Sequence, residues 1–392
     1  MRPLDGITVL SLEHAIAAPF ATRQLADLGA RVIKVERPGV GDFARNYDAR
    51  VNGLASHFVW TNRSKESLSL NVKHPRAADI LNSLALKADV LVQNLAPGAA
   101  ARLGLSYEAL HDANPRLIVC NISGYGESGP DRNRKAYDLM IQSEAGLLSI
   151  TGTPEQPSKA GNSIADIAAG MYAYTNILAA LIQRGQTGKG CKIDLSLFEA
   201  MVEWMGYPMY YAFDGAPPPP RSGGTHATIS PYGPFAAGDG RVVMLGLQNE
   251  REWRIFCEKV LDHPALAADP RFTSNALRAE NKTALRDIIL SHFAALSGDE
   301  VVARLDAAGI ANARMNEMRD VWSHPQLRAR ERWVDVQTAA GPVPALLPPG
   351  GSNAYVPRMD PVPALGEHSR AILSELGLSA DEIAALVEDN AI

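Results

Sequence analysis

The chain has 392 residues, of which 46% are hydrophobic and 21% are charged, and its formal net charge at pH 7 is −5. This length and composition suit a globular protein with about two domains and a large core. The acidic balance excludes a general attraction to nucleic acid or to an anionic membrane, so a phosphate-bearing ligand would need local basic groups.

Residues 1–125 alternate between strand and helix patterns. Strands are predicted at 7–12, 31–36, 67–72, 89–93 and 117–122, and helices at 19–28 and 77–87. Alternating β and α elements predict a mainly parallel, Rossmann-like sheet with helices on both faces. The turn after the first strand contains no glycine, which excludes the pyrophosphate-binding turn of nicotinamide- and flavin-dependent enzymes.

A long apolar run from 164 to 182 carries one formal charge, on Asp166. The run approaches membrane-spanning length, but its polar residues favour a buried core helix. A lone carboxylate on an apolar helix needs a partner or a function. Asp166 is therefore either an acid in the first turn of the helix or a reactive group. In both cases we expect the helix N-terminus to keep it ionised.

A proline- and glycine-rich stretch over 207–240 separates two parts of the chain. Strand and helix patterns follow it, and Ser379 and Glu382 have the spacing of a capping box for a last helix. We predict an α/β protein of three segments. They are a large parallel-sheet domain over 1–210, a linker with a glycine-rich loop and a small α+β domain over 211–330, and C-terminal helices over 331–392 that return to the large domain.

The sequence contains no Walker loop, HExxH or GxSxG motif, and no cluster of Cys and His at metal-ligand spacing. Three dispersed cysteines, Cys120, Cys191 and Cys257, indicate reduced thiols, and the first residues have no signal-peptide pattern. We therefore expect a cytoplasmic protein that binds no metal, nucleic acid or membrane.

Basic and polar residues stand at the ends of several predicted elements in the first domain. They are Arg37, Lys73, Asn94, Arg102 and Lys135. Each alone could be an ordinary solvated surface residue. As a set they fit a ligand with several phosphates that lies across the carboxyl ends of a parallel sheet.

Eight segments, in order along nearly the whole chain, resemble the class III coenzyme A transferases, the family of formyl-CoA and carnitine CoA-transferases. They are 4–10, 25–38, 62–68, 88–94, 102–105, 124–130, 166–173 and 365–368. The resemblance implies an interlocked homodimer, and it implies that CoA and acyl-CoA are substrates rather than tightly bound cofactors.

The resemblance also implies roles for particular residues. Asp166, in Asp-x-x-x-Gly, corresponds to the nucleophile of the family. Glycines 223 and 224 correspond to a mobile loop whose amides could stabilise oxyanions. Ile16 replaces a glutamine of some relatives, which leaves the preferred acyl group open. Residues that match the CoA contacts of the family are Arg37, Leu70, Lys73, Asn94, Arg102, Lys135 and Tyr137.

A lone carboxylate suits CoA transfer, because the exchange of one thioester for another needs only an equally activated intermediate. A carboxylate supplies it as a mixed anhydride and then as an aspartyl-CoA thioester. Residues 203–234 look most like the branch that acts on C4–C5 dicarboxylic acids. Candidate substrate contacts lie nearby: Arg221, Gly223, Gly224 and His226. Arg221 could instead face solvent, and His226 could be structural.

Our working hypothesis is CoA transfer from succinyl-CoA to a C5 dicarboxylate such as itaconate, mesaconate or citramalate. Intramolecular C1–C4 transfer on mesaconyl-CoA is one alternative. Another is an α-methylacyl-CoA racemase, whose histidine base would precede Asp138, where this chain has Tyr137. A phenol is a poor general base at neutral pH, so Tyr137 favours transfer. A CoA-binding module without activity would need neither Asp166 nor the glycine-rich loop.

Overall fold

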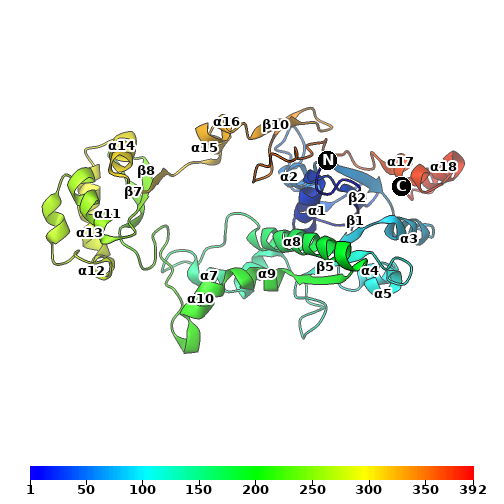
Figure 1. Ribbon diagram of the computed structural model, residues 1–392, viewed down its shortest axis with the longest axis horizontal. Coiled ribbons are helices and arrows are strands. Elements are labelled where there is room, and N and C mark those ends of the chain that lie inside the picture. The colour runs from blue at the N-terminus through cyan, green and yellow to red at the C-terminus, as the bar shows by residue number, and fades with distance from the viewer. The chain divides into compact units, whose positions relative to one another are not determined.

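The computed structural model describes residues 1–392, which form two compact units (Figure 1). Unit 1 comprises residues 1–146, 160–206 and 327–392, and unit 2 comprises residues 147–159 and 207–326. The segment 147–159 lies in unit 2, whereas we expected it in the large domain. Backbone hydrogen bonds explain the difference, because the Gly223 amide donates to the carbonyl of Gly152 at 2.7 Å.

Unit 1 is built on a six-stranded sheet in the order β3-β2-β1-β4-β5-β6, and every neighbouring pair is parallel. The strands are β1 (Thr8–Leu12), β2 (Arg31–Glu36), β3 (Lys65–Ser69), β4 (Val90–Gln93), β5 (Ile118–Ser123) and β6 (Lys192–Ser196). This is the order of doubly wound folds, which bind ligands at the carboxyl edge where the order reverses. Here that point lies between β1 and β4.

In this sheet, the predicted strands agree with the observed ones to within one residue except at β3 and β6. Strand β3 begins two residues earlier than predicted, because Lys65 already pairs with Val32, and the Asn71 amide instead donates to the carbonyl of Ala391 at 2.7 Å. Strand β6 was not predicted. It is an edge strand in which Lys192 and Asp194 face solvent, so it lacks a continuous apolar run.

Helices cover both faces of this sheet. Leu10, Ile33 and Leu68 point to one face, where they pack with α3 (Ala77–Lys87), α17 (Ser369–Glu375) and α18 (Ala380–Glu388). On the other side, α1 (Ala17–Asp27) packs against α8 (Ile164–Thr187), as Figure 1 shows. The chain therefore returns to the large unit at its C-terminus, as predicted, and the capping box of Ser379 and Glu382 at the start of α18 is confirmed.

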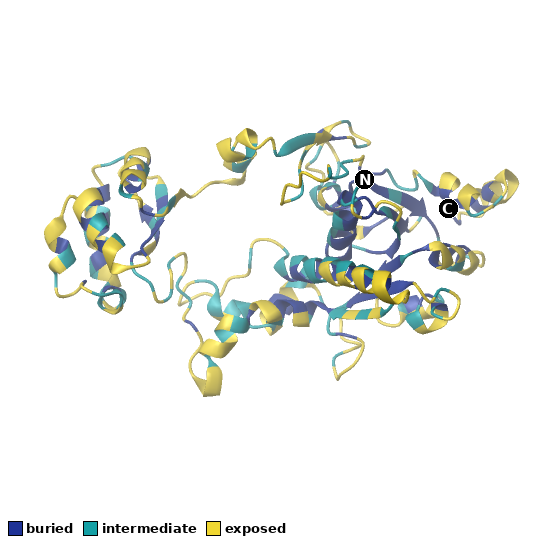
Figure 2. Cartoon of the chain, in the orientation of Figure 1, coloured by how far each residue is buried: buried dark blue, intermediate teal, exposed yellow.

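The remaining elements of unit 1 are short. They are η1 (Phe43–Asn46), α2 (Ser56–Asn62), α4 (Ala99–Arg102), α5 (Tyr107–Leu110), α6 (Asp138–Glu144), α9 (Leu197–Trp204) and the antiparallel pair β10 (Trp333–Val336) and β11 (Val343–Leu346). Figure 2 shows that the strands of the sheet are largely buried, while the outer faces of the helices are exposed.

Unit 2 is a small α+β structure, as predicted. Its three-stranded antiparallel sheet has the order β7-β8-β9. Trp253, Phe256, Phe272 and Phe293 are buried in its core. Its elements are α7 (Leu147–Ile150), α10 (Gly206–Tyr211), η2 (Phe213–Gly215), β7 (Tyr232–Ala236), β8 (Val242–Gly246), α11 (Glu250–Ile255), η3 (Phe256–Val260), η4 (Pro264–Ala268), α12 (Asn275–Glu280), α13 (Lys282–Phe293), α14 (Gly298–Ala308), β9 (Asn312–Arg314) and α15 (Met318–Trp322), with α16 (Pro325–Ala329) at the boundary of the units.

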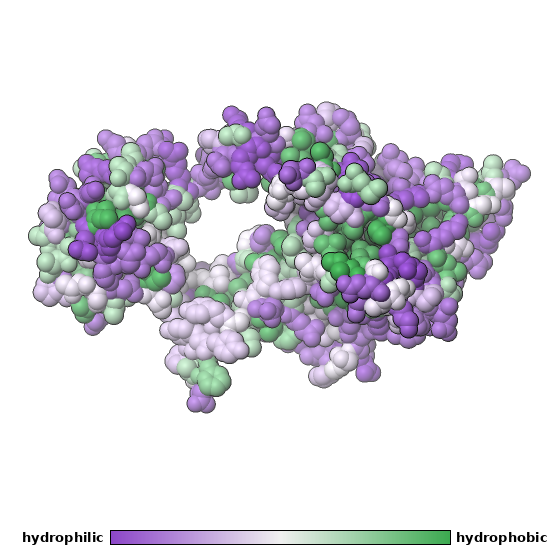
Figure 3. All heavy atoms as spheres, viewed as in Figure 1, coloured by the Kyte–Doolittle hydropathy of each residue, from purple (hydrophilic) through white to green (hydrophobic).

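Helix α8 is long and apolar enough to cross a membrane, but this is weak evidence because core helices of soluble proteins share these properties. One face, which includes Ala168, Ala169 and Ala173, is fully buried against unit 1. The other face is open, and Ile182 is 68% exposed. Apolar atoms are visible on this side of unit 1 in Figure 3. The predicted core helix is therefore buried along one face only.

Candidate active site

A cavity of about 1180 Å³ lies at the carboxyl edge of the parallel sheet in unit 1. Residues that follow four different strands line it: His14 after β1, Arg37 after β2, Asn94 after β4 and Gly124 after β5. Asp166, in the first turn of α8, lines the same cavity. The position of the cavity matches the crevice expected at a topological switch point, and the cavity volume exceeds that needed for a drug-sized ligand.

The cavity brings together most of the predicted site residues. It contains Ile16, Arg37, Leu70, Lys73, Asn94, Arg102, Lys135, Tyr137 and Asp166. The other predicted residues, Arg221, Gly223, Gly224 and His226, belong to unit 2. The convergence in unit 1 follows from the parallel sheet, because the carboxyl ends of its strands meet at one edge.

Four cations around the cavity have no acidic partner. Arg37, Lys73, Arg102 and Lys135 are exposed and form no ion pair. Some other basic residues of unit 1 are paired: Arg45 binds Glu36 at 2.7 Å, and Arg63 binds Asp27 at 2.8 Å. Unpaired positive charges at the rim of one cavity suit a ligand with several negative charges.

Asp166 is partly buried, and its acidity is strongly perturbed. Burial, and then the negative charge of Asp138, raise the pKa of Asp166 from 3.8 to about 7. The expectation that the helix N-terminus keeps this carboxylate ionised is therefore wrong, because desolvation and a like charge outweigh the helix dipole. A carboxylate with this pKa is both a stronger base and a stronger nucleophile than an exposed one.

Gly170 explains the Asp-x-x-x-Gly spacing. Residues four apart lie on the same face of a helix, so Asp166 and Gly170 face the same neighbour. A Cβ atom on Gly170 would lie 2.7 Å from the carbonyl oxygen of Ala17 and 3.0 Å from Cδ1 of Phe20. The glycine therefore lets the start of α1 approach α8 within one turn of Asp166.

The loop from β1 to α1 is held by polar contacts on both sides. The Asn94 amide accepts from the His14 N–H through Oδ1 and donates to the His14 carbonyl through Nδ2, both at 2.9 Å. Ala15 has a left-handed conformation (φ 62°), and its N–H donates to Asp42 Oδ1 at 2.9 Å. Asn94 therefore lines the cavity, but both of its side-chain polar atoms bind the backbone of this loop.

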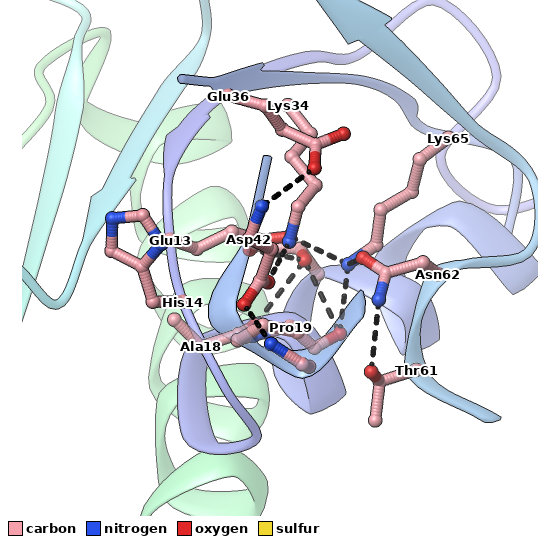
Figure 4. A network of polar contacts seen from close by, with 12 residues as sticks. Glu13, His14, Ala18, Pro19, Lys34, Glu36, Asp42, Thr61, Asn62 and Lys65 are labelled. Carbon is pink, nitrogen blue, oxygen red and sulfur yellow. Dashed lines mark hydrogen bonds and ion pairs between the residues drawn. The ribbon is translucent and has the colours of Figure 1, made fainter. Parts of the chain in front are cut away.

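Figure 4 shows the buried charged network that supports this loop. The side chains of Glu13, Lys34, Asp42 and Lys65 are fully buried. Lys34 Nζ donates to Asp42 Oδ2 at 2.6 Å, and Lys65 Nζ donates to Glu13 Oε1 at the same distance. Although burial alone would raise the pKa of Glu13, the charges of Lys65 and Lys34 lower it to about 2. Burial also lowers the pKa of Lys65 from 10.5 to about 7, so the charge on this amine depends on its pairing with Glu13.

Sequence reasoning missed three groups in the cavity. The hydroxyl of Tyr47, which follows η1, lies near Asp166: its pKa is raised by burial and by the charges of Asp42 and Asp166. His14 lines the cavity, and its Nδ1 has no hydrogen-bond partner. Asp138 accepts hydrogen bonds from the start of α8. Their positions depend on contacts between distant segments, and no local motif marks them.

The predicted substrate contacts of unit 2 are engaged within that unit. Arg221 donates to the carbonyl oxygens of Thr153 and Pro154 at 2.9 and 2.8 Å. His226 Nδ1 accepts from the amides of Thr228 and Ile229 at 3.2 and 3.1 Å. The Gly223 amide is bound to the Gly152 carbonyl, so of the two glycine amides only that of Gly224 has no partner.

The fold and the site define an α/β enzyme in which a carboxylate lines a cavity and cations stand at its rim. The sequence model of CoA-transferase family III matches residues 4–369. The chain belongs to this family.

Individual relatives agree with this assignment. A succinyl-CoA:glutarate CoA-transferase of Mus musculus is 36% identical over 386 residues, which covers 96% of this chain and 87% of that protein. A succinyl-CoA–D-citramalate CoA-transferase of Chloroflexus aurantiacus is 30% identical over 398 residues, with coverage of 98% and 97%. The crystal structure of a CaiB/BaiF family protein from Brucella suis has a TM-score of 0.87 at 34% identity and covers 96% of this chain and 99% of that one.

Proposed function

We propose that this CoA-transferase moves CoA from succinyl-CoA to a C5 dicarboxylic acid, with Asp166 as the covalent nucleophile. The observation that carries the proposal is the position of Asp166 in a cavity whose rim holds four unpaired cations. A carboxylate inside a cavity can be acylated, and the cations can hold the phosphates of CoA while the acyl group changes.

In the first half of the reaction, an oxygen of Asp166 attacks the thioester carbon of succinyl-CoA. The C–S bond breaks, CoA leaves as a thiolate, and a mixed anhydride of Asp166 and succinate forms. The thiolate then attacks the Asp166 carbonyl carbon, which releases succinate and leaves an aspartyl-CoA thioester. Arg37, Lys73, Arg102 and Lys135 would retain CoA by its phosphates during both steps.

The second half runs the same steps in reverse with the acceptor acid. Its carboxylate attacks the aspartyl thioester, CoA leaves again as a thiolate, and a mixed anhydride with the acceptor forms. The thiolate attacks the acceptor carbonyl carbon, which gives the new acyl-CoA and returns Asp166 as a carboxylate. The atoms and charges balance without ATP or an external base. The unpartnered amide of Gly224 is a candidate donor to the oxyanions.

Two observations support a C5 dicarboxylate as the acceptor. Relatives with 36% and 30% identity carry names that specify glutarate and citramalate, which are both C5 dicarboxylates. The second carboxylate of such an acid needs a cation or several N–H donors. Arg221 and His226 remain our candidates; both would have to exchange their present contacts with backbone groups for contacts with the substrate.

The test is a comparison of acids that differ by one carboxylate. With succinyl-CoA as the donor, we expect kcat/KM for glutarate, itaconate or citramalate to exceed that for valerate by about 100-fold or more, because a site built for a polar group rejects its apolar analogue. Mass detection of each new thioester gives the rates. Equal rates for glutarate and valerate would refute the dicarboxylate assignment and would leave the role of Asp166 to its own test.

We also propose that the enzyme is a homodimer and that it works in the cytoplasm. The open face of α8 supports the dimer, as do two residues of unit 2, Tyr210 and Phe213, which are 81% and 73% exposed. Exposed apolar surface of this kind typically marks a contact with another chain. The three free cysteines support a reducing compartment.

A further inference from the structure

Helix α8 begins without a cap from its own sequence. Ser163 is at the N-cap position, but its side chain accepts no hydrogen bond from the first turn. The acceptor comes from α6 instead: Oδ1 of Asp138 accepts from the N–H of Ala165 at 2.8 Å and from the N–H of Asp166 at 3.3 Å. The first amides of a helix need such an acceptor. The helix that carries the nucleophile is thus anchored by a residue 28 positions away.

A second hydrogen bond orients the Asp138 carboxylate. Its Oδ2 accepts from Gln142 Nε2 at 2.6 Å, one turn further along α6. Gln142 is fully buried, and its Oε1 accepts from the Ala160 N–H at 2.9 Å. Both oxygens of Asp138 therefore accept hydrogen bonds, and these bonds hold the carboxylate against the start of α8.

Asp138 is also the acidic group that faces Asp166. Burial and this charge raise the pKa of Asp166, and no cation contributes to it. The phenol of Tyr47 is the other titratable group close to this carboxylate, while Tyr137, His14 and Lys135 share the cavity. Other elements packed against α8 carry titratable groups that bind other partners or lie in the sheet. Arg23 binds Asp27, and Glu199 accepts from Ser196. Asp194 accepts from the Glu127 amide, and Cys120 is buried in β5.

We propose that Asp138 is a positioning residue for the nucleophile: it fixes the first turn of α8 and holds a negative charge against the Asp166 carboxylate. This inference rests on the proposed role of Asp166. The charge raises the free energy of ionised Asp166, and the repulsion disappears when Asp166 becomes an uncharged anhydride or thioester. Asp138 therefore favours formation of the covalent intermediates and makes Asp166 a more basic nucleophile.

A charge relocation separates the two parts of this role. In Asp138→Asn, Oδ1 still accepts from Ala165, but the new amide group meets the amide of Gln142. Adding Gln142→Glu removes that conflict, because the Glu carboxylate accepts from the Asn amide and still accepts from the Ala160 N–H. The double variant thus keeps the hydrogen bonds and moves the negative charge away from Asp166. Asp138→Ala removes both the bonds and the charge. Ser379→Ala, which uncaps α18 in the same unit, is the control for a lost cap.

The readouts are the titration of Asp166, followed by 13C NMR of carboxyl-labelled aspartate with Asp166→Asn for assignment, and the pH dependence of kcat/KM. We expect the Asp166 titration and the ascending limb of kcat/KM to move about one pH unit lower in the double variant. In Asp138→Ala, we expect kcat to fall about 10- to 100-fold with a nearly unchanged KM for succinyl-CoA, because the nucleophile is displaced rather than the CoA site. Ser379→Ala should change neither quantity.

An unchanged Asp166 titration in the double variant would overturn the proposal, as would an Asp138→Ala enzyme with full kcat. The NMR measurement does not depend on turnover. If the wild-type enzyme transferred CoA to no acid, the proposed function would fail, while the titration would still decide whether Asp138 acts on Asp166.

Discussion

Replacement of Asp166 by asparagine is expected to lower CoA transfer by at least about 10⁴-fold, because an amide cannot form the anhydride or the thioester and nucleophile losses in other enzymes have this size or larger. Binding of CoA, measured by calorimetry, should change little, since the four rim cations are untouched. Asp112→Asn, at an exposed carboxylate outside the cavity, is the matched control and should retain full activity.

The same variant should be more stable than the wild type at alkaline pH. The pKa of Asp166 is raised from 3.8 to about 7, so folding favours the protonated acid. The stability from this group is complete below about pH 4 and is lost as the pH rises through about 7. An asparagine carries no such penalty, and we expect a gain of up to about 4 kcal/mol in the free energy of unfolding at pH 8, and none at pH 4. Lost activity together with lost stability would instead indicate misfolding.

Removal of Asp42 is expected to destabilise unit 1 by about 3–5 kcal/mol, the usual cost of breaking a buried ion pair. Asp42→Ala leaves Lys34 fully buried with only Glu13, at 3.4 Å, as an acidic partner, and it removes the acceptor of the Ala15 and Ala44 amides. Urea denaturation followed by circular dichroism gives the free energy of unfolding of each resolved transition.

The control for Asp42 is the exposed ion pair of Arg76 and Glu382, whose charged atoms are 3.6 Å apart. Arg76→Ala should cost less than about 1 kcal/mol, because water screens both groups. If Asp42→Ala also cost less than about 1 kcal/mol, the buried network would not be what holds the loop between β1 and α1.

The fold was predictable wherever a local pattern determined it. The strand β2 and the helix α3 lie where their apolar patterns place them, residue for residue. The strand β6 was missed because an edge strand needs no apolar run, and its partner β5 lies some 70 residues earlier along the chain. Which strands pair is decided by the assembled sheet, and the pattern of one segment carries no information about it.

The candidate site shows the same division. The rim cations were predictable because the carboxyl ends of parallel strands meet at one edge, so Arg37 and Lys73 had to be near each other. The groups that hold the site in place were not predictable. Asp138 accepts from the Ala165 amide, and Asp42 accepts from the Ala15 amide, across long sequence separations. The pKa of Asp166 could not be predicted either, since burial and a like charge exist only in the folded chain.

The most direct test of the central claim is to trap the thioester on Asp166. Wild-type enzyme is incubated with succinyl-CoA, reduced with borohydride and digested, and the peptide that contains residue 166 is sequenced by mass spectrometry, with Asp166→Asn as the blank. An aspartyl-CoA thioester is reduced to homoserine, so we predict homoserine at position 166 only when succinyl-CoA is present. Unmodified aspartate at 166, or homoserine at another acidic position, would contradict the assignment of Asp166 as the nucleophile.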